Sequence, residues 1–218
     1  MNHNKEQKKL WDSKYSSQTD FFGIEASDIA SQSIDLFNEH SVHKVLELGC
    51  GQGRDTWYMV RAGFRVFGLD YSEVGIHQMK EKSEEHGLNC ELQVHDGLEP
   101  LPFRNEDLDA VFSHMFFNMP FTMDQLEGIM KECLRILRPG GLLVYSVRNT
   151  NDQQYGEFTP VGEDTWQNPL GFKVHFFSEE KIRALSKDFE FVSIREFEEG
   201  PQSLIKTLYE VVLQKPQW

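Results

Sequence analysis

The sequence predicts an α/β fold in which helices pack on both faces of a mostly parallel sheet. From residue 44 onward, short runs typical of β-strands alternate with longer amphipathic segments, which is the pattern of βαβ units. The chain has 218 residues, of which 39% are hydrophobic, and this is enough for one domain with a substantial core. The sequence shows no internal repeat and no low-complexity tract, so we expect a single domain.

The first predicted βαβ unit begins with a buried strand at Lys44–Leu48. A helix is expected over Arg54–Ala62, and Gly63 is suited to end it in a left-handed conformation. Ser72 is suited to cap the N-terminus of the next helix, and Gly87 to end it. The second and third strands are expected at Arg65–Leu69 and Asn89–Val94.

The second half of the sheet is expected to begin with a fourth strand at Leu108–Ser113. Thr122 and Gln125 form the sequence signature of a capping box, which predicts a helix that begins there and ends near Leu137. A turn and a fifth strand should follow, the turn at Pro139-Gly140-Gly141 and the strand at Leu142–Val147.

The segment 148–177 differs from the regions around it. It is polar, contains several glycines and prolines and shows no sustained period, so we expect a long functional loop there. Ser178 is expected to cap a helix that runs to about Ser186. Two closing strands are expected at Phe189–Phe197 and Leu204–Leu213.

Two short helices are expected ahead of the sheet, over Lys5–Lys14 and Ala26–Asn38. The linker between them carries Phe21 and Phe22. The two helices form either a lid over a ligand site or a cover for one edge of the sheet, and spacing alone does not separate these interpretations.

Composition narrows the class of partner. The chain carries 22 Lys and Arg against 35 Asp and Glu, a formal net charge of -13, so it should repel nucleic-acid phosphates and anionic membrane surfaces. No apolar run approaches the roughly 20 residues needed to span a bilayer, and the N-terminus lacks the apolar core of a secretory signal. Cys50, Cys90 and Cys133 are too widely spaced for a zinc or disulfide pattern. We therefore expect a cytoplasmic protein with no required metal.

A glycine-rich loop follows the first predicted strand. Gly49, Gly51 and Gly53 alternate between this strand and the next helix, which lets the backbone approach a ligand closely. Arg54 stands where the dinucleotide fingerprint G-x-G-x-x-G requires its third glycine, so NAD is disfavoured. The Lys and hydroxyl of a triphosphate-binding loop are also missing.

Two acids lie beyond the next two predicted strands. Asp70 follows the second strand, about 20 residues after the glycines, where a carboxylate can accept both hydroxyls of a ribose. Asp96 follows the third strand, where it can accept a hydrogen bond from an exocyclic amine. Each acid alone is typical of a turn or a helix cap, but together they favour an adenosine ligand.

These motifs resemble, in order, those of class I S-adenosylmethionine-dependent methyltransferases. The resemblance covers most of residues 40 to 147. A weaker similarity, at Gly51–Thr56 and Phe176–Glu180, is to the tellurite-resistance and thiopurine methyltransferase branch. The motifs that carry the main resemblance are Val45–Gly53, Gly68–Ser72, Asp96 and Leu137–Gly141.

The resemblance implies a Rossmann-like, doubly wound sheet of seven strands whose last strand is antiparallel. It also implies S-adenosyl-L-methionine as cofactor and S-adenosyl-L-homocysteine as product. It divides the single domain into a helical lid (1–40), a cofactor-binding core (41–147), a substrate loop (148–177) and a closing helix and strand pair (178–218). The residues expected at the cofactor are Tyr15, Glu47, Gly49, Cys50, Gly51, Gly53, Asp70, Tyr71, Asp96, Gly97 and Ser113.

The methyl acceptor is not identified by these motifs. His114, just past the fourth strand, is the candidate general base, and the alternative is a histidine hydrogen-bonded to the cofactor or the sheet. The run Ser113–Phe116 departs from the N/D-P-P-Y/F motif of enzymes that methylate amino groups of bases, which disfavours DNA adenine methylation. Loop residues that could line an acceptor pocket are Arg148, Tyr155, Glu157, Asp164, Trp166 and His175.

We expect methyl transfer to a small-molecule acceptor through an S, N, O or metalloid nucleophile, by a monomer or a dimer. The alternative is an adenosine-cofactor-binding protein of the same fold with a regulatory role or a reaction other than methyl transfer.

Overall fold

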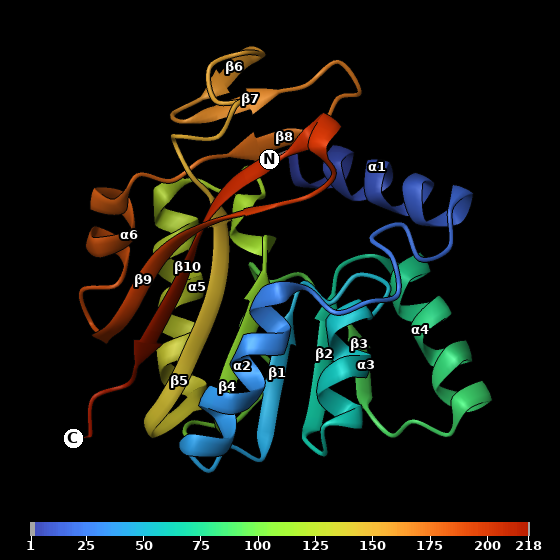
Figure 1. The fold of residues 1–218 in the computed structure, drawn as a ribbon, viewed down its shortest axis with the longest axis vertical. Coiled ribbons are helices and arrows are strands. Elements are labelled where there is room, and N and C mark those ends of the chain that lie inside the picture. The colour runs from blue at the N-terminus through green and yellow to red at the C-terminus, as the bar shows by residue number, and fades with distance from the viewer. Residues whose placement is uncertain (1–2, 218) are drawn as a thin grey trace.

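The computed structural model describes residues 3–217 and contains a seven-stranded sheet with helices on both faces (Figure 1). The strand order is β3-β2-β1-β4-β5-β10-β9. Strands β1 to β5 are mutually parallel, and β10 is antiparallel to both of its neighbours. The predicted fold class, including the antiparallel last strand, is therefore confirmed. The strands are β1 (Lys44–Leu48), β2 (Arg65–Asp70), β3 (Glu91–Val94), β4 (Leu108–His114), β5 (Leu137–Arg148), β9 (Glu190–Glu199) and β10 (Lys206–Gln214).

The helices form two layers because successive strand residues point to opposite faces of the sheet. In β4, Ala110 and Phe112 pack in the core beneath α2 and α3, whereas Val111 between them packs in the core beneath α5 and α6. Helix α4 packs beside α3 through Ile76 and Met79. The helices are α1 (His3–Ser17), α2 (Asp28–Glu39), α3 (Arg54–Arg61), α4 (Glu73–His86), α5 (Met123–Ile136) and α6 (Glu179–Leu185).

The helix ends form at the predicted caps. The Ser72 hydroxyl accepts a hydrogen bond from the Gly75 N–H at the start of α4, and Gly87 ends that helix with a φ of 61°. Both hydrogen bonds of the predicted capping box at Thr122 and Gln125 are present. These caps satisfy backbone groups that a helix end would otherwise leave unpaired.

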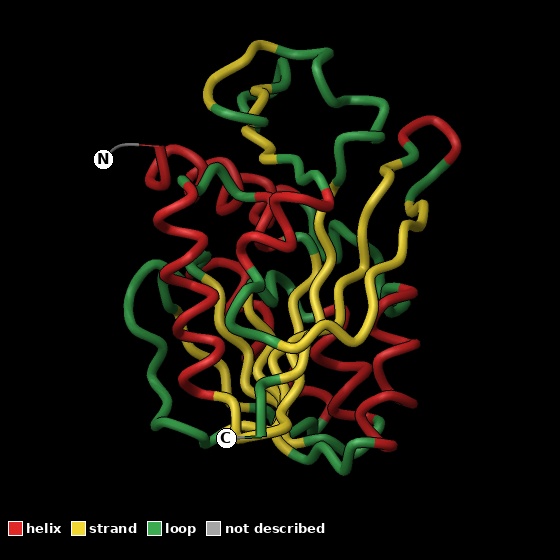
Figure 2. Tube along the Cα trace, turned by 90° about the vertical axis from the view of Figure 1, so that its left-hand side faces the viewer, coloured by secondary structure: helices red, strands yellow, loops and turns green. Residues whose placement is uncertain are grey.

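The prediction of an irregular loop at 148–177 is wrong in part. The segment contains three short antiparallel strands, β6 (Thr159–Gly162), β7 (Thr165–Gln167) and β8 (Lys173–His175). This small sheet stands above the carboxyl ends of the main strands (Figure 2). Strands of three or four residues are too short for an alternating pattern to be recognised in the sequence.

The predicted turn at residues 139–141 lies within strand β5. The pairing of β4 with β5 shifts there, from Leu108 opposite Leu137 to Ala110 opposite Leu142. Gly140 has a φ of 74°, and its N–H donates to the Lys215 carbonyl beside it. These residues therefore make an irregularity inside a longer strand, where the segment just after β10 accepts the hydrogen bond.

In residues 3–217, none of the helices is both long enough and apolar enough to cross a membrane.

Candidate cofactor and acceptor site

The glycine loop between β1 and α3 has a backbone that only glycine adopts easily. Gly49, Gly51 and Gly53 have φ values of 81°, 54° and 86°, all in the left-handed region. The N–H groups of Gly49 and Cys50 both donate to the Leu69 carbonyl, which fixes the loop to the end of β2. A Cβ at Gly51 would lie 2.8 Å from the Tyr15 hydroxyl oxygen, so the loop also leaves no room for a side chain.

Asp70 joins the glycine loop to the start of α4. Its Oδ2 accepts a hydrogen bond of 2.8 Å from the Gly51 N–H, and its Oδ1 accepts one of 2.7 Å from the Ser72 N–H. Burial raises the pKa of Asp70 to about 6, although these two N–H groups favour the carboxylate. A carboxylate has about four acceptor positions, and these two N–H groups use two of them.

Glu47 and Cys50 are buried beside the loop and serve its packing. The Thr56 hydroxyl donates to Glu47 Oε2, so this carboxyl supports the first turn of α3. Burial, together with the nearby Asp55 charge, raises the pKa of Glu47. Burial also raises the pKa of the Cys50 thiol, which leaves it a poor nucleophile.

Phe116 lies between the glycine loop and the loop after β3. A Cβ at Gly49 would lie 2.7 Å from Phe116 Cβ, and one at Gly97 would lie 2.6 Å from its Cζ. Beside it, the Tyr71 hydroxyl is 4.0 Å from Met119 Sδ, and burial raises its pKa. An aromatic wall thus lines the region between the ends of β1, β2 and β3.

Asp96 lies at the exposed rim of this region. Its Oδ1 accepts a hydrogen bond of 3.1 Å from the Leu98 N–H. The carboxylate therefore shapes the turn after β3.

Helix α1 and the segment after it cover the glycine loop. Tyr15 is 5% exposed, and its carbonyl accepts a 3.0 Å hydrogen bond from Gln78 Nε2 of α4. Gln52 of the loop donates to the Gln18 carbonyl and accepts from the Phe21 N–H. Helix α1 crosses above the carboxyl end of the sheet, whereas α2 packs on one face (Figure 1).

An aromatic cluster completes this cover. The Trp11 ring lies 5.6 Å from Tyr15 and 4.8 Å from Phe172, measured between ring centroids. Its ring also lies 5.9 Å from that of Phe22. The cluster links α1 to the segment just before β8.

His114, the last residue of β4, is held by groups from two other strands. Its Nδ1 lies 2.7 Å from the Ser146 hydroxyl of β5, and its Nε2 lies 2.9 Å from Glu199 Oε2 at the end of β9. Within the described residues, Nε2 and Oε2 are buried atoms whose contact lacks the alignment of a hydrogen bond. The histidine is thus hydrogen-bonded to the sheet through Nδ1. Its Nε2 and Glu199 Oε2 lie close together, but their hydrogen bonding is incomplete.

Glu199 lies close to two cationic side chains. Arg54 Nη1 lies 3.6 Å from Glu199 Oε1, and Lys206 is its cross-strand partner on β10. Burial alone would raise the pKa of Glu199, but the His114 imidazole and these two cations outweigh burial and lower it to about 2. The carboxyl is therefore ionised at neutral pH.

Glu199, Ser146 and Lys206 were not among the residues expected at the site. The closing strands were predicted to stop at Phe197 and to resume at Leu204, so Glu199 fell into the turn between them. The acidic pair Glu198-Glu199 before Gly200-Pro201 was the sequence signal that pointed to a feature there.

Ser113 and most of the loop residues contact other groups of the protein. The Ser113 hydroxyl donates to the Leu48 carbonyl at 3.0 Å. Arg148 Nε donates to Asp152 Oδ2 at 2.9 Å. Glu157 is exposed, and Trp166 packs against the Tyr155 ring.

His175 belongs to a buried network that fixes the small sheet to α6. Its Nδ1 lies 3.1 Å from the Phe121 carbonyl, and its Nε2 lies 3.2 Å from Lys181 Nζ. Lys181 pairs with Asp164, which also accepts from the Tyr155 hydroxyl. Burial and the Lys181 charge lower the pKa of His175 to about 4, so it stays neutral in this network.

Three known proteins share sequence with most of this chain. It is 28% identical over 198 residues to the probable S-adenosyl-L-methionine-dependent methyltransferase TehB of Haemophilus influenzae, covering 88% of this chain and 62% of that protein. It is 25% identical over 199 residues to the tRNA N(3)-methylcytidine methyltransferase trm140 of Schizosaccharomyces pombe (84% and 64%). It is 31% identical over 175 residues to the sarcosine/dimethylglycine N-methyltransferase of Aphanothece halophytica (79% and 59%). The chain thus spans about three-fifths of the length of each relative.

The solved structure of TehB from Haemophilus influenzae has the same fold. It superposes with a TM-score of 0.67 at 22% identity and covers 94% of this chain and 67% of that one. Residues 45–141, which contain the glycine loop, Asp70 and Asp96, match the family described as methyltransferase domain. Over these residues the chain is thus similar to a methyltransferase domain, and its fold is that of the solved TehB structure.

Proposed function

We propose that the protein transfers a methyl group from S-adenosyl-L-methionine to a small-molecule acceptor and releases S-adenosyl-L-homocysteine. The observation that carries the proposal is the contact of Asp70 with the Gly51 N–H beneath Tyr15. At this point Asp70, the residue expected to bind the ribose, meets the glycine loop and the helix α1 that covers it. The point lies at the carboxyl edge of the sheet, where open α/β sheets bind ligands.

The residues present fit the cofactor. The left-handed glycines keep side chains out of a loop that Tyr15 and Phe116 already pack against, so only backbone would face the ligand there, and the two remaining acceptor positions of Asp70 suit a ribose diol. Asp96 would accept the adenine amine at the rim, beside Gly97. The sulfonium supplies an electrophilic methyl group, and the chain's residues align the nucleophile and exclude water.

A small molecule is the acceptor that the charge of the chain favours. A polynucleotide brings many phosphates, which a chain of net charge -13 would repel. The cover of α1 over the loop likewise favours a compact acceptor, since Tyr15 is buried there. We also propose that the protein acts in the cytoplasm and that its reaction requires no metal.

His114 is the proposed base for an acceptor that must lose a proton. In support, its Nε2 and Glu199 Oε2 are buried, close together and poorly aligned, so a bound acceptor group would complete their hydrogen bonding. If the acceptor is already ionised, His114 has only a positioning role. His114→Ala then separates the two cases, because loss of a base lowers kcat far more than cofactor affinity.

The first test is calorimetry of the purified protein with S-adenosylmethionine, S-adenosylhomocysteine and NAD. We expect the two adenosyl ligands to bind and NAD not to bind, and failure of both adenosyl ligands would refute the proposal. The second test incubates the protein with methyl-labelled cofactor and either a metabolite extract or bulk tRNA. Label in tRNA would overturn the small-molecule acceptor, and binding with no transfer would favour a regulatory adenosine-cofactor protein of the same fold.

A further inference from the structure

Lys206 is an enclosed cation whose charge is only partly compensated. It begins β10 at the carboxyl edge of the sheet and is only partly exposed. Within residues 3–217, its ammonium makes neither an ion pair nor a hydrogen bond, and the Phe22 ring, whose centroid is 6.0 Å away, covers it. Burial lowers the pKa of Lys206. The nearby Glu199 charge raises it, but the charges of Arg148 and Arg54 act with burial, and the pKa stays below its ordinary value.

The acids near Lys206 are already engaged by other cations. Glu199 lies within ion-pair distance of both His114 and Arg54. Asp152 is bound by Arg148 and also accepts from the Thr207 N–H. Glu199 therefore compensates the Lys206 charge only in part, because it is shared with His114 and Arg54, and an anion brought by a ligand would offset the remaining cost of enclosing the ammonium.

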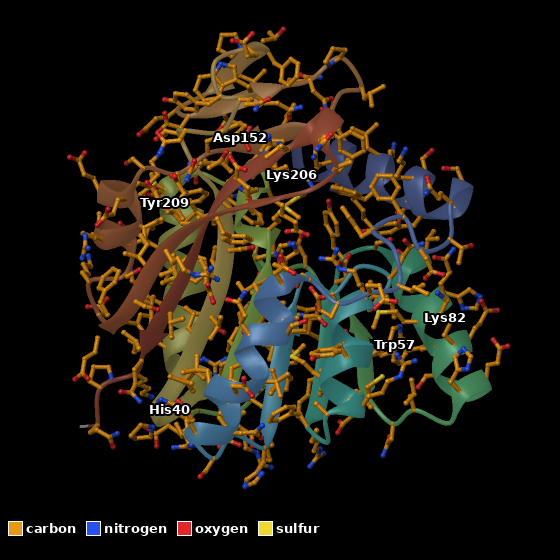
Figure 3. All side chains as sticks on the ribbon, in the orientation of Figure 1. His40, Trp57, Lys82, Asp152, Lys206 and Tyr209 are labelled. Carbon is orange, nitrogen blue, oxygen red and sulfur yellow. The ribbon has the colours of Figure 1, made fainter. Side chains whose placement is uncertain are left out.

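The sheet order places Lys206 on the side of the site that faces away from the adenosine. The expected ribose and adenine contacts lie at the ends of β2 and β3, whereas β10 is two strands beyond β4 in the other direction. Figure 3 shows Lys206 above the carboxyl edge near Asp152, away from Lys82 on α4. Glu199 is the cross-strand partner of Lys206, and its Oε2 lies 2.9 Å from His114 Nε2, so the histidine and the ammonium flank the same carboxylate.

We propose that Lys206 binds a carboxylate of the methyl acceptor and so selects small acceptors that carry one. The inference rests on the proposed function and names the substrate class of that site. The acceptor's nucleophile would lie near His114 while its carboxylate, several bonds away, pairs with the ammonium beneath Phe22. One ammonium, in a chain of net charge -13, suits a singly charged carboxylate better than a phosphate dianion.

The cofactor also carries a carboxylate, so the experiment must separate the two sources. Full-length protein saturated with S-adenosylhomocysteine is titrated with acetate, propionate and benzoate and with their uncharged amides, and binding is followed by calorimetry. Lys206→Met removes the charge, Lys206→Arg retains it, and Lys80→Met removes a charge from the exposed face of α4 as the matched control.

We expect at least one carboxylate to bind at least tenfold more tightly than its amide. Lys206→Met should abolish this preference, whereas Lys206→Arg and Lys80→Met should keep it, and all variants should bind S-adenosylhomocysteine within twofold of the wild type. Equal binding of acids and amides, or a preference that survives in Lys206→Met, would overturn the proposal. Weakened S-adenosylhomocysteine binding in Lys206→Met would also overturn it, because the cation would then serve the cofactor's carboxylate.

A second readout identifies the acceptor itself. Products labelled in the metabolite extract are examined by mass spectrometry before and after esterification of carboxyl groups. A carboxylate in the principal product, with a KM at least tenfold higher in Lys206→Met, supports the assignment, and a product without one contradicts it. Failure of wild-type protein to bind S-adenosylhomocysteine is a different result, since it refutes the proposed function.

Discussion

Replacing Asp70 by Asn gives the most direct test of the cofactor site. The carboxylate accepts the N–H groups of Gly51 and Ser72, one on each oxygen. An Asn side chain keeps the shape but turns one of these oxygens into an NH2 donor that faces an N–H group. The substitution therefore removes the charge, breaks one backbone contact and withdraws half of the acceptor positions left for a ribose.

The expected loss can be worked from the hydrogen bonds. A hydrogen bond to a charged group contributes about 1.5 to 3 kcal/mol, so the loss of one such bond and the weakening of a second costs roughly 2 to 4 kcal/mol. S-adenosylhomocysteine should then bind roughly 30- to 1000-fold more weakly to Asp70→Asn.

The pH dependence of stability and of cofactor affinity gives a second, independent test of Asp70. The pKa of Asp70, at about 6 in the folded protein, lies above its ordinary value of 3.8, so the folded state holds the proton more tightly than the unfolded chain. The stability of the ligand-free protein should fall as pH rises from about 4 to about 6, by roughly 3 kcal/mol. Cofactor binding should change in the opposite sense, because only the ionised Asp70 accepts two ribose bonds, and should weaken about tenfold between pH 7 and pH 5.

Calorimetry with S-adenosylhomocysteine from pH 5 to pH 8 measures the change in affinity, and urea unfolding of the ligand-free protein from pH 4 to pH 6 measures the change in stability. Asp70→Asn should show weak binding that hardly depends on pH, and Asp35→Asn, at an exposed position of α2, should behave as the wild type. If Asp70→Asn binds as tightly as the wild type, the carboxylate does not hold the ribose. If wild-type affinity is flat across this range, the raised pKa does not govern binding.

Three further substitutions test separate parts of the structure. Gly51→Ala forces a side chain into a left-handed position 2.8 Å from the Tyr15 hydroxyl, so it should weaken S-adenosylhomocysteine binding and destabilise the fold by about 1 to 3 kcal/mol, measured by calorimetry and thermal unfolding. Glu199→Gln removes a carboxyl whose pKa of about 2 lies below its ordinary 4.5, so its stabilisation of roughly 2 to 3 kcal/mol is present above pH 4.5 and lost toward pH 2, as urea unfolding at several pH values would show. Thr122→Ala removes half of the α5 capping box and should cost about 1 kcal/mol in urea unfolding while leaving cofactor affinity unchanged.

Features that depend on neighbouring residues in the chain could be predicted from the sequence. The cap at Ser72 needs only the N–H of Gly75, three residues on, and the capping box links Thr122 to Gln125 over the same distance. The left-handed glycines could be predicted because alternate glycines after a buried strand have few other uses. Each of these signals lies within a single turn or loop.

Features that depend on strand register could not be predicted in this way. His114 meets Ser146 because these two residues are partners in the pairing of β4 with β5, and the irregularity at Gly140 within β5 sets that register. Glu199 reaches His114 because the β9–β10 hairpin extends to the same edge of the sheet. The sequence does not reveal these contacts, because Ser146 and Glu199 lie 32 and 85 positions after His114 in the chain. They become its neighbours only when the sheet forms.

The cofactor side of the site depends on local motifs, whereas the acceptor side depends on strand register. The residues proposed to hold the cofactor lie in loops after β1, β2 and β3, where short motifs fix their conformation and where the family match lies. The residues proposed to meet the acceptor, His114, Glu199 and Lys206, are joined only through the order β4-β5-β10-β9. Because the two groups are built by separate elements, changes at the β9–β10 turn can alter the acceptor without disturbing the cradle for the cofactor. A carboxylate preference that disappears in Lys206→Met at unchanged S-adenosylhomocysteine affinity is what this separation requires.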